Sequence, residues 1–225
     1  MPRLVAVLVL FLGLVSPTRV DAYMLCSFLG ICPYLSPGFT LTVVDAESGK
    51  PVADVYAWAE WVQNANHGLN GPIMIQEATS DGAGRVSFPW WGPRFGYRAG
   101  LDIGADPAVI LFKSGYATMV VYNGERPGMR LADAIRVFTK NAETIRLSPF
   151  GGSVDERLGQ IRTVVFSPAM GRVSDDQAAG FRAIYLRRFD LAMAELRLLT
   201  SDNEAVGRLR ASLERDRQFF AGGLQ

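Results

Sequence analysis

The feature that most constrains this 225-residue chain is a change in its hydrophobic period near Gly151 and Gly152. From Gly38 onward, apolar residues recur at every second position in short runs, and these runs are separated by turn-forming residues. This is the pattern of β-strands with one buried face. Beyond Gly152 the period becomes 3.6, which is typical of amphipathic helices. The sequence therefore predicts a β-sandwich over residues 38–150 and a helical segment over residues 151–225.

Seven short strands are predicted in the first part, and the region around Asp81-Gly82 is typical of a β-hairpin. Together with the turn residues between them, they favour an antiparallel seven-stranded β-sandwich. The segment 130–138 is ambiguous, because Leu131, Ile135 and Phe138 also fit a short helix. The predicted strands cover residues 39–44, 52–62, 74–79, 85–91, 109–112, 117–122 and 144–147.

Five motifs in this region resemble those of the carboxypeptidase regulatory-like domain family. The motifs are Phe39-Thr-Leu-Thr-Val-Val-Asp45, Gly49-Lys-Pro51-Val52, Thr79-Ser-Asp81-Gly82-Ala-Gly84-Arg-Val86, Lys113-Ser-Gly115-Tyr116 and Ile145-Arg-Leu147-Ser-Pro149. Their order and spacing carry the resemblance, which implies a transthyretin-like seven-stranded sandwich. It also implies a non-catalytic binding or scaffolding role on an exported bacterial protein. The chain departs from the family in a long aromatic insert between Trp90 and Pro107.

Residues 1–22 have the composition of a secretory signal peptide. Arg3 precedes an apolar run from Leu4 to Val15, and Val20-Asp-Ala22 suits cleavage after Ala22. As a helix this run would span about 18 Å, which is short of the roughly 30 Å hydrocarbon core. We therefore expect a cleaved signal and a periplasmic or secreted protein, with an uncleaved N-terminal anchor as the alternative. Neither cysteine follows the small residues of a lipoprotein signal, so lipid anchoring is not expected.

The cysteines Cys26 and Cys32 lie in the predicted N-terminal segment, residues 23–37. In an oxidising compartment they are expected to form a disulfide that closes a short loop. A disulfide that closes such a loop would stabilise the folded protein by about 2–3 kcal/mol. A redox-active pair is the alternative, although the spacing is not Cys-x-x-Cys.

The helical segment contains three capping boxes, Ser153-x-x-Glu156, Ser174-x-x-Gln177 and Ser201-x-x-Glu204. Each predicted helix has an apolar stripe, and the solvent side of the second helix is expected to hold Arg182, Arg187, Arg188, Asp190, Glu195 and Arg197. We expect the stripes to pack on each other and on the sandwich; recruitment of another envelope protein is the alternative. The stripes are Val154, Leu158, Ile161 and Val165; Phe181, Tyr185, Phe189, Ala192, Met193, Leu196 and Leu199; and Val206, Leu209, Leu213 and Phe220.

Composition excludes several classes of protein. There are 23 basic and 22 acidic residues, so no overall field attracts nucleic acid. The one histidine, His67, lies in a turn-rich loop, and together with two cysteines it cannot build a His/Cys zinc cluster. No catalytic residue, metal or cofactor is predicted. A calcium site using Asp45, Glu47 or Asp81 is the alternative to a turn-forming role for these residues.

An aromatic stretch from Phe88 to Tyr97 exceeds what packing alone requires. In a strand, Trp90 and Trp91 would point to opposite faces, so one would be exposed or covered by the helical segment. Core packing is one reading, and a platform of Trp90, Trp91 and Tyr97 for sugar rings or a peptide is the other. The sequence thus predicts an exported, non-enzymatic binding or interaction protein of the bacterial envelope, whose partner is another envelope protein or a glycan. A small carbohydrate-binding module is the alternative.

Overall fold

A computed structural model describes residues 31–65, 68–97, 107–123, 135–165, 175–199 and 203–222. In these ranges strands come first and helices follow, as the change of hydrophobic period predicts. The strands are β1 (Ile31–Ser36), β2 (Phe39–Asp45), β3 (Tyr56–Ala65), β4 (Gly68–Thr79), β5 (Arg85–Phe88), β6 (Trp91–Tyr97), β7 (Ala108–Phe112), β8 (Met119–Val121) and β9 (Thr144–Leu147). The helices are α3 (Val154–Val165), α4 (Asp175–Leu198) and α5 (Glu204–Gly222).

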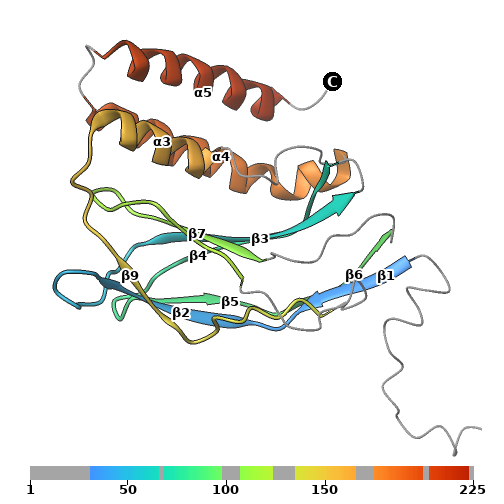
Figure 1. Ribbon diagram of the computed structural model, residues 1–225. Coiled ribbons are helices and arrows are strands. Elements are labelled where there is room, and N and C mark those ends of the chain that lie inside the picture. Colours follow the sequence, from blue (N-terminus) through green and yellow to red (C-terminus); the bar gives the residue numbers. More distant parts are fainter. Residues whose placement is uncertain are drawn as a thin grey trace, which may run out of the picture.

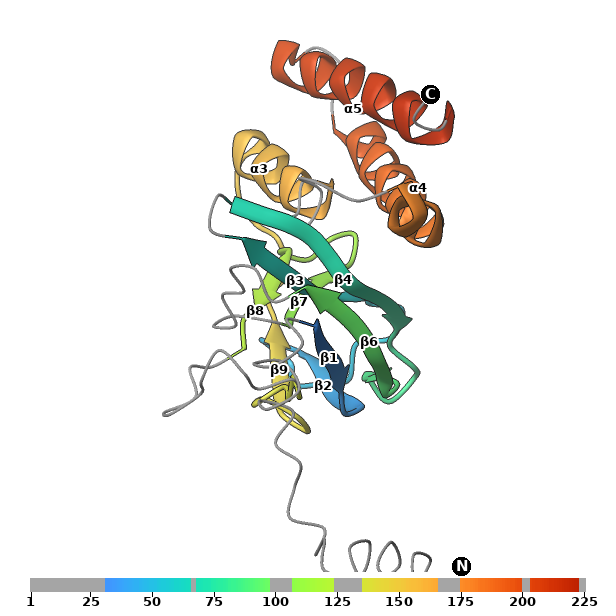
Figure 2. The same ribbon diagram turned by 90° about the vertical axis from the view of Figure 1, so that its right-hand side faces the viewer.

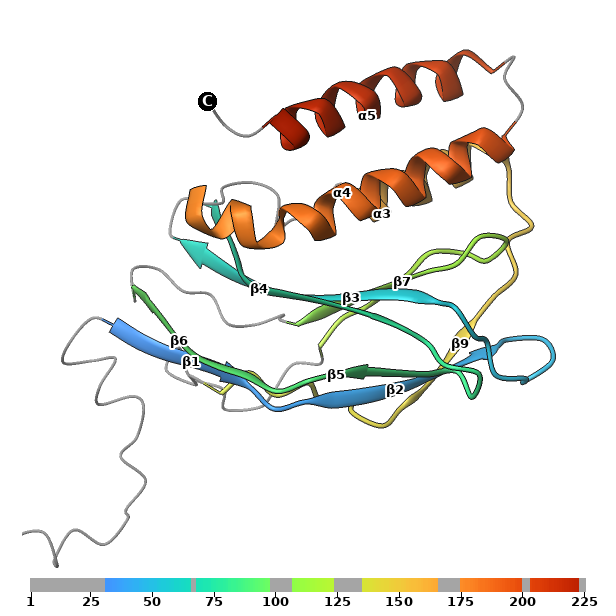
Figure 3. The same cartoon turned by 180° about the vertical axis from the view of Figure 1, so that it is seen from behind.

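The strands form two facing sheets with a small third sheet beside them (Figure 1). One sheet has the order β5-β2-β9, the second β4-β3-β7-β8, and the third consists of β1 and β6. Alternate residues of β2 and β3, among them Leu41, Val43 and Trp61, fill the space between the two larger sheets. The helices cover the outer face of the four-stranded sheet (Figure 2). Seen from behind, α5 is the layer farthest from the strands (Figure 3).

The prediction of a purely antiparallel seven-stranded sandwich is wrong in two respects. β9 runs parallel to β2, with Thr42 opposite Thr144 and Asp45 opposite Leu147. The described residues also contain nine strands, because β1 and β6 form an antiparallel pair that the sequence pattern did not indicate. A long connection separates β2 from β9, so local patterning carries no information on their relative direction.

The predicted strand 85–91 is divided in the structure, since β5 ends at Phe88 and β6 begins at Trp91. β6 then passes very close to β1: a Cβ on Gly92 would lie 2.5 Å from the Cβ of Leu35. Gly92 also has a φ of 113°, which side chains rarely tolerate. Glycine at this position therefore permits the β1–β6 pair.

The hairpin predicted at Asp81-Gly82 is also wrong, because this turn joins two different sheets. β4 belongs to the four-stranded sheet, whereas β5 pairs with β2. The turn chemistry is nevertheless as the sequence suggests. The Asp81 carboxylate accepts hydrogen bonds from the N–H groups of Ala83 and Arg85, at 2.9 Å each. A turn sequence therefore specifies that the chain reverses direction, but it does not specify which strand the next segment pairs with.

The described part of the ambiguous segment, residues 135–138, is not helical. The Arg136 N–H donates to the Leu35 carbonyl at 2.7 Å, and Ile135 forms an isolated bridge to Leu35. Phe138 is buried in the sandwich core, with its ring centroid 4.4 Å from that of Phe39. The apolar residues that suggested a helix therefore supply side chains to the β core instead.

The three helices pack on one another as their apolar stripes predict. Leu158 and Ile161 of α3, Phe189 and Leu196 of α4, and Leu209 of α5 belong to one buried cluster. α4 also packs on β4 through Phe181 and Tyr185, which enclose Ile75. No helix in the described ranges is long and apolar enough to cross a membrane.

The capping predictions have different outcomes. The Ser153 box is confirmed: the Glu156 N–H donates to Ser153 Oγ at 3.3 Å, and the Ser153 N–H donates to Glu156 Oε2 at 2.7 Å. α5 instead begins after Asn203, whose Oδ1 accepts from the Ala205 N–H at 2.8 Å. The box predicted from Ser201 is therefore wrong, because Glu204 is already the first helical residue. The Ser174 box involves a residue outside the described ranges.

Candidate functional site

The junction between the helices and the four-stranded sheet contains a fully buried arginine, Arg188 of α4. Its Nη1 donates to Glu60 Oε1 of β3 at 2.7 Å, and its plane lies over Trp58 with 4.6 Å to the ring centroid. The same guanidinium donates to the carbonyls of Val164 and Val165 at 2.7 and 3.2 Å. One side chain therefore connects α4, the end of α3 and the sheet.

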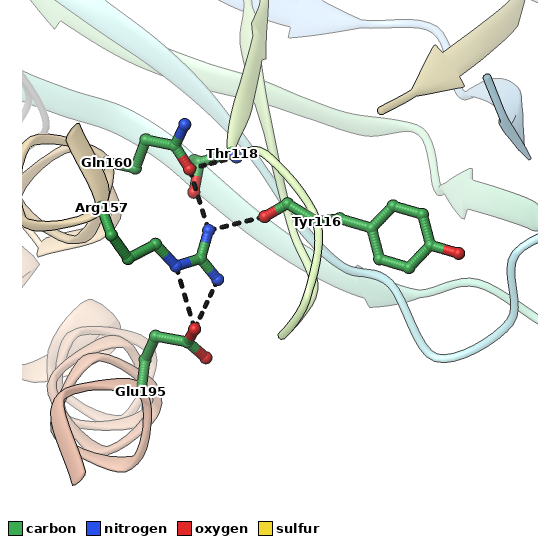
Figure 4. A network of polar contacts seen from close by, with 5 residues as sticks. All are labelled: Tyr116, Thr118, Arg157, Gln160 and Glu195. Carbon is green, nitrogen blue, oxygen red and sulfur yellow. Dashed lines mark hydrogen bonds and ion pairs between the residues drawn. The ribbon is translucent and has the colours of Figure 1, made fainter. Parts of the chain in front are cut away.

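A second buried arginine, Arg157 of α3, forms the polar network in Figure 4. Its Nε and Nη2 donate to Glu195 Oε1 of α4 at 2.9 and 2.6 Å. Its Nη1 donates to the Tyr116 carbonyl at 2.6 Å and to Gln160 Oε1 at 2.8 Å. Gln160 Oε1 also accepts from the Thr118 N–H at 3.1 Å, just before β8. The network thus holds both helices against the edge of the sheet.

Two of the charged residues predicted to face solvent, Arg188 and Glu195, are therefore buried. The reason is that α4 is covered on two sides, by the sheet and by the other helices. The sequence does contain a pattern that predicts this burial. Arg188 and Glu195 have opposite charges and stand seven positions apart, with the apolar Leu191 and Ala192 between them. Such spacing places both charges on one face with apolar neighbours. The prediction holds for the exposed Arg187, Asp190 and Arg197.

Beside the Arg157 network lies a cavity of about 260 Å³, which we call the α4 hollow. Aromatic rings of Tyr56 and Phe112 line it from the sheet side, and both residues are largely buried. Leu198 lines it from the helix and is 69% exposed. The hollow is lined by Asp54, Tyr56, Phe112, Lys113, Ser114, Leu191, Ala194, Glu195 and Leu198.

The rim of the α4 hollow at Asp54 is held in an unusual conformation. Asp54 has a φ of 55°, in the left-handed region, which aspartate tolerates better than most residues. Buried Ser80 fixes the surrounding turn: its Oγ donates to the Val52 carbonyl and accepts from the Val55 N–H, both at 2.8 Å. The ammonium of Lys113 donates to the Ala53 carbonyl at 2.8 Å. The position of the exposed Asp54 is therefore set by its neighbours.

The phenol groups at the junction are held in their neutral form. Burial, reinforced by the hydrogen bond to Glu77, raises the pKa of Tyr56 well above its usual range. Its hydroxyl donates to Glu77 Oε2 at 2.6 Å, and Glu77 also pairs with Arg187. Burial likewise raises the pKa of Tyr185, and the nearby Glu60 carboxylate adds to this effect. Both tyrosines can donate a hydrogen bond at neutral pH, but neither is an activated nucleophile.

The two tryptophans of the predicted platform differ in exposure. Trp90 is 57% exposed, on the connection between β5 and β6. Trp91 is 4% exposed and packs edge-on against Trp61, with ring centroids 5.4 Å apart. Trp91 therefore belongs to the core and offers no face to a ligand. Tyr97 is the last residue of β6, opposite Ile31, and its side chain lies outside the described part.

Several predicted features fall on residues that the structure does not describe. The signal peptide, Cys26 and His67 lie outside the described ranges. Cys32 lies in β1, but the predicted disulfide depends on Cys26 and stays a prediction.

Of the three candidate calcium ligands, Asp45 and Asp81 use their carboxylates to hold turns, and Glu47 donates its N–H to Asp45 Oδ1 at 3.1 Å. Asp45 Oδ1 accepts from the Ser48 N–H at 2.7 Å and from Ser48 Oγ at 2.8 Å. These bonds, led by the Ser48 backbone N–H, lower the pKa of Asp45. Across the described residues, no group of three His, Cys, Asp or Glu side chains is gathered as metal ligands. Turn formation accounts for Asp45 and Asp81 without a cation.

No protein-family model and no curated protein matches this chain. Several solved structures show distant similarity, among them the two that follow. The 3-chlorocatechol 1,2-dioxygenase from Rhodococcus opacus 1CP is 14% identical, with a TM-score of 0.32, over 52% of this chain and 61% of that chain. The full-length major pilin SpaD from Corynebacterium diphtheriae is 12% identical, with a TM-score of 0.28, over 52% of this chain and 30% of that chain. This chain thus spans less than two thirds of either, and these similarities carry no argument about function.

Proposed function

We propose that the chain is an exported, non-enzymatic interaction protein of the bacterial envelope, built on a carboxypeptidase regulatory-like sandwich. The observation that carries this proposal is the α4 hollow, where aromatic rings and the exposed Leu198 lie beside a rim set by Ser80 and Lys113. Exposed apolar side chains next to a preformed hollow are typical of protein docking sites. The expected signal peptide supports the location.

The size and chemistry of the hollow favour binding over catalysis. Its volume of about 260 Å³ is below the roughly 300–1,000 Å³ of small-molecule pockets, so it suits a single side chain of a partner. The ionisable groups near it hold the fold together: Arg157 binds Glu195, and Tyr56 binds Glu77. Ionisable groups that are engaged in such pairs support a structural role for this region rather than a catalytic one.

The test is crosslinking and pull-down of the mature protein, residues 23–225, from the native envelope. We compare the wild type with Leu198→Lys, which puts a positive charge at the mouth of the hollow. Tyr122→Ser is the matched control, because Tyr122 is 61% exposed and does not line the hollow. A reproducible partner should be lost with Leu198→Lys and kept with Tyr122→Ser. Recovery of no partner, or equal recovery with both variants, contradicts the proposal.

A carbohydrate-binding module is the second candidate, and the exposed ring of Trp90 favours it. A flat amphipathic ring in water suits stacking against a sugar. The test is tryptophan fluorescence during titration with soluble glycans and peptidoglycan fragments, with Trp90→Ala as the comparison. A spectral change in the wild type that Trp90→Ala abolishes would support it. No change across the series removes this candidate.

A further inference from the structure

We propose that the α4 hollow takes a lysine side chain from the partner polypeptide. The aliphatic part would pack on Tyr56, Phe112 and Leu198, and the ammonium would meet the carboxylates of Asp54 and Glu195. This inference rests on the proposed function and deepens it, because it states the chemistry of the partner at that site.

The first argument is the unused hydrogen-bonding capacity of Glu195. Its Oε1 accepts both bonds from Arg157. Among the hydrogen bonds of the described residues, none engages Oε2, and Glu195 lines the hollow. The exposed Asp54 carboxylate at the rim is a further acceptor, since only its backbone N–H has a partner among the described residues, the Ser80 carbonyl at 3.0 Å.

The second argument is that the cations nearest the hollow already have partners. Lys113 is the cationic residue of the described lining, and one of its three N–H groups donates to the Ala53 carbonyl at 2.8 Å, which ties the ammonium to the rim. Arg157 distributes its guanidinium among Glu195, the Tyr116 carbonyl and Gln160. Glu195 Oε2 and the Asp54 carboxylate therefore remain as anionic acceptors at the hollow, and a donor of positive charge complements them.

The third argument concerns the walls of the hollow. Tyr56 and Phe112 supply aromatic rings, and Leu191 and Leu198 supply aliphatic surface. A lysine combines an apolar stem with a compact cationic head, so it satisfies both parts of the site. A leucine or methionine would fill the space but leave the Glu195 oxygen without a donor. A glutamate would be repelled by both carboxylates.

The test is an NMR titration of the mature protein, with the methyl groups of Leu191 and Leu198 as probes. The ligands are three blocked tripeptides, acetyl-Gly-Xaa-Gly-amide with lysine, norleucine or glutamate at the centre. The lysine peptide should shift both leucines and bind about fivefold more tightly than the norleucine peptide, with weaker binding at higher salt. The glutamate peptide should produce no shift.

The matched variant is Asp54→Asn, because asparagine also tolerates the left-handed conformation. It should weaken the lysine peptide about fivefold and leave the norleucine peptide unchanged. Equal binding of lysine and norleucine, or no shift with either, overturns the inference. If that happens while Leu198→Lys still abolishes capture of the partner, the lysine assignment fails and the proposed function stands. If both results are negative, both proposals fail.

Discussion

At the scale of single residues, Arg188 joins α4 and the end of α3 to the four-stranded sheet. The Arg188 side chain is 1% exposed, and that of its partner Glu60 is 2% exposed. Two charges in this setting stabilise the fold only as a pair, because either one alone lacks compensation for its lost hydration. The rings of Trp58 and Tyr185 complete the enclosure, since both lie within 6 Å of the guanidinium carbon.

We therefore expect Arg188→Met to lower the free energy of unfolding by about 3–5 kcal/mol, because it leaves the buried Glu60 carboxylate without its cationic partner. Urea denaturation measures the change. The double variant Arg188→Met with Glu60→Gln should recover at least half of the loss, since it removes the unpaired charge and keeps an acceptor for the Trp58 indole N–H. The exposed Arg197→Met is the control. An Arg188→Met protein as stable as that control would show that the pair does not anchor α4.

Asp45 gives a pH-dependent prediction. Its pKa is lowered by hydrogen bonds from the Ser48 N–H and Oγ. A folded-state pKa below the unfolded value of about 3.9 means that the contribution is present above that pH and is lost as pH falls through the folded pKa. Asp45→Asn should therefore slightly reduce the free energy of unfolding at neutral pH. Below about pH 4, the free energy of unfolding of this variant should fall less steeply with decreasing pH than that of the wild type. Stability curves from pH 7 to pH 2 test this, and identical acid limbs for both proteins would refute it.

At the scale of elements, the helix starts are set by single polar side chains. Ser153 begins α3 and Asn203 begins α5, each by accepting a backbone N–H from the first turn. The sequence identifies Ser153 because Glu156 stands three residues later. It does not single out Asn203, because Ser201 and Glu204 have the same spacing and compete for the assignment. Which of two polar residues close in sequence caps a helix depends on the path by which the chain enters it.

We expect Ser153→Ala and Asn203→Ala each to cost about 1 kcal/mol of stability. Ser212→Ala, in the middle of α5, should be neutral or slightly stabilising, because alanine is the better helix former there. Thermal unfolding followed by circular dichroism at 222 nm compares the three variants. If Asn203→Ala behaves like Ser212→Ala, Asn203 is not the cap.

At the scale of the whole molecule, the sandwich and the helical segment share their interior. Val164 of α3 packs with Trp58, Ile110 and Phe112 of the sheet. The outer face of the four-stranded sheet is therefore a second core rather than a solvent-facing surface. This arrangement predicts that sandwich and helices unfold together, although the sequence divides them at Gly151-Gly152.

A chain that ends at Phe150 lacks the helices, so it should expose the apolar outer face of the four-stranded sheet. We expect such fragments to associate with one another through this face. We expect such a fragment to elute as oligomers in size-exclusion chromatography and to bind a hydrophobic dye, whereas the chain of residues 23–225 elutes as a discrete species and binds little dye. In the chain of residues 23–225, near-ultraviolet and far-ultraviolet circular dichroism should report the same unfolding transition. A monomeric fragment without dye binding, or two separated transitions, would show that the sandwich is independent of the helices.

The sequence alone determined the kind of structure along the chain: the strand-rich first part, the apolar stripes of three helices, the cap at Ser153 and the turn at Asp81. These features follow from the hydrophobic period and from side chains that hydrogen-bond to the backbone a few residues away. Residues close together in the sequence are therefore enough to predict them. Tertiary structure alone decided the parallel pairing of β9 with β2, the inward turn of Trp91, the burial of Arg188 and Glu195, and the α4 hollow. The Arg188–Glu60 contact joins residues 128 positions apart. A periodic pattern records only that one face of an element is buried, and it cannot say which distant element covers that face or whether a second face is covered as well.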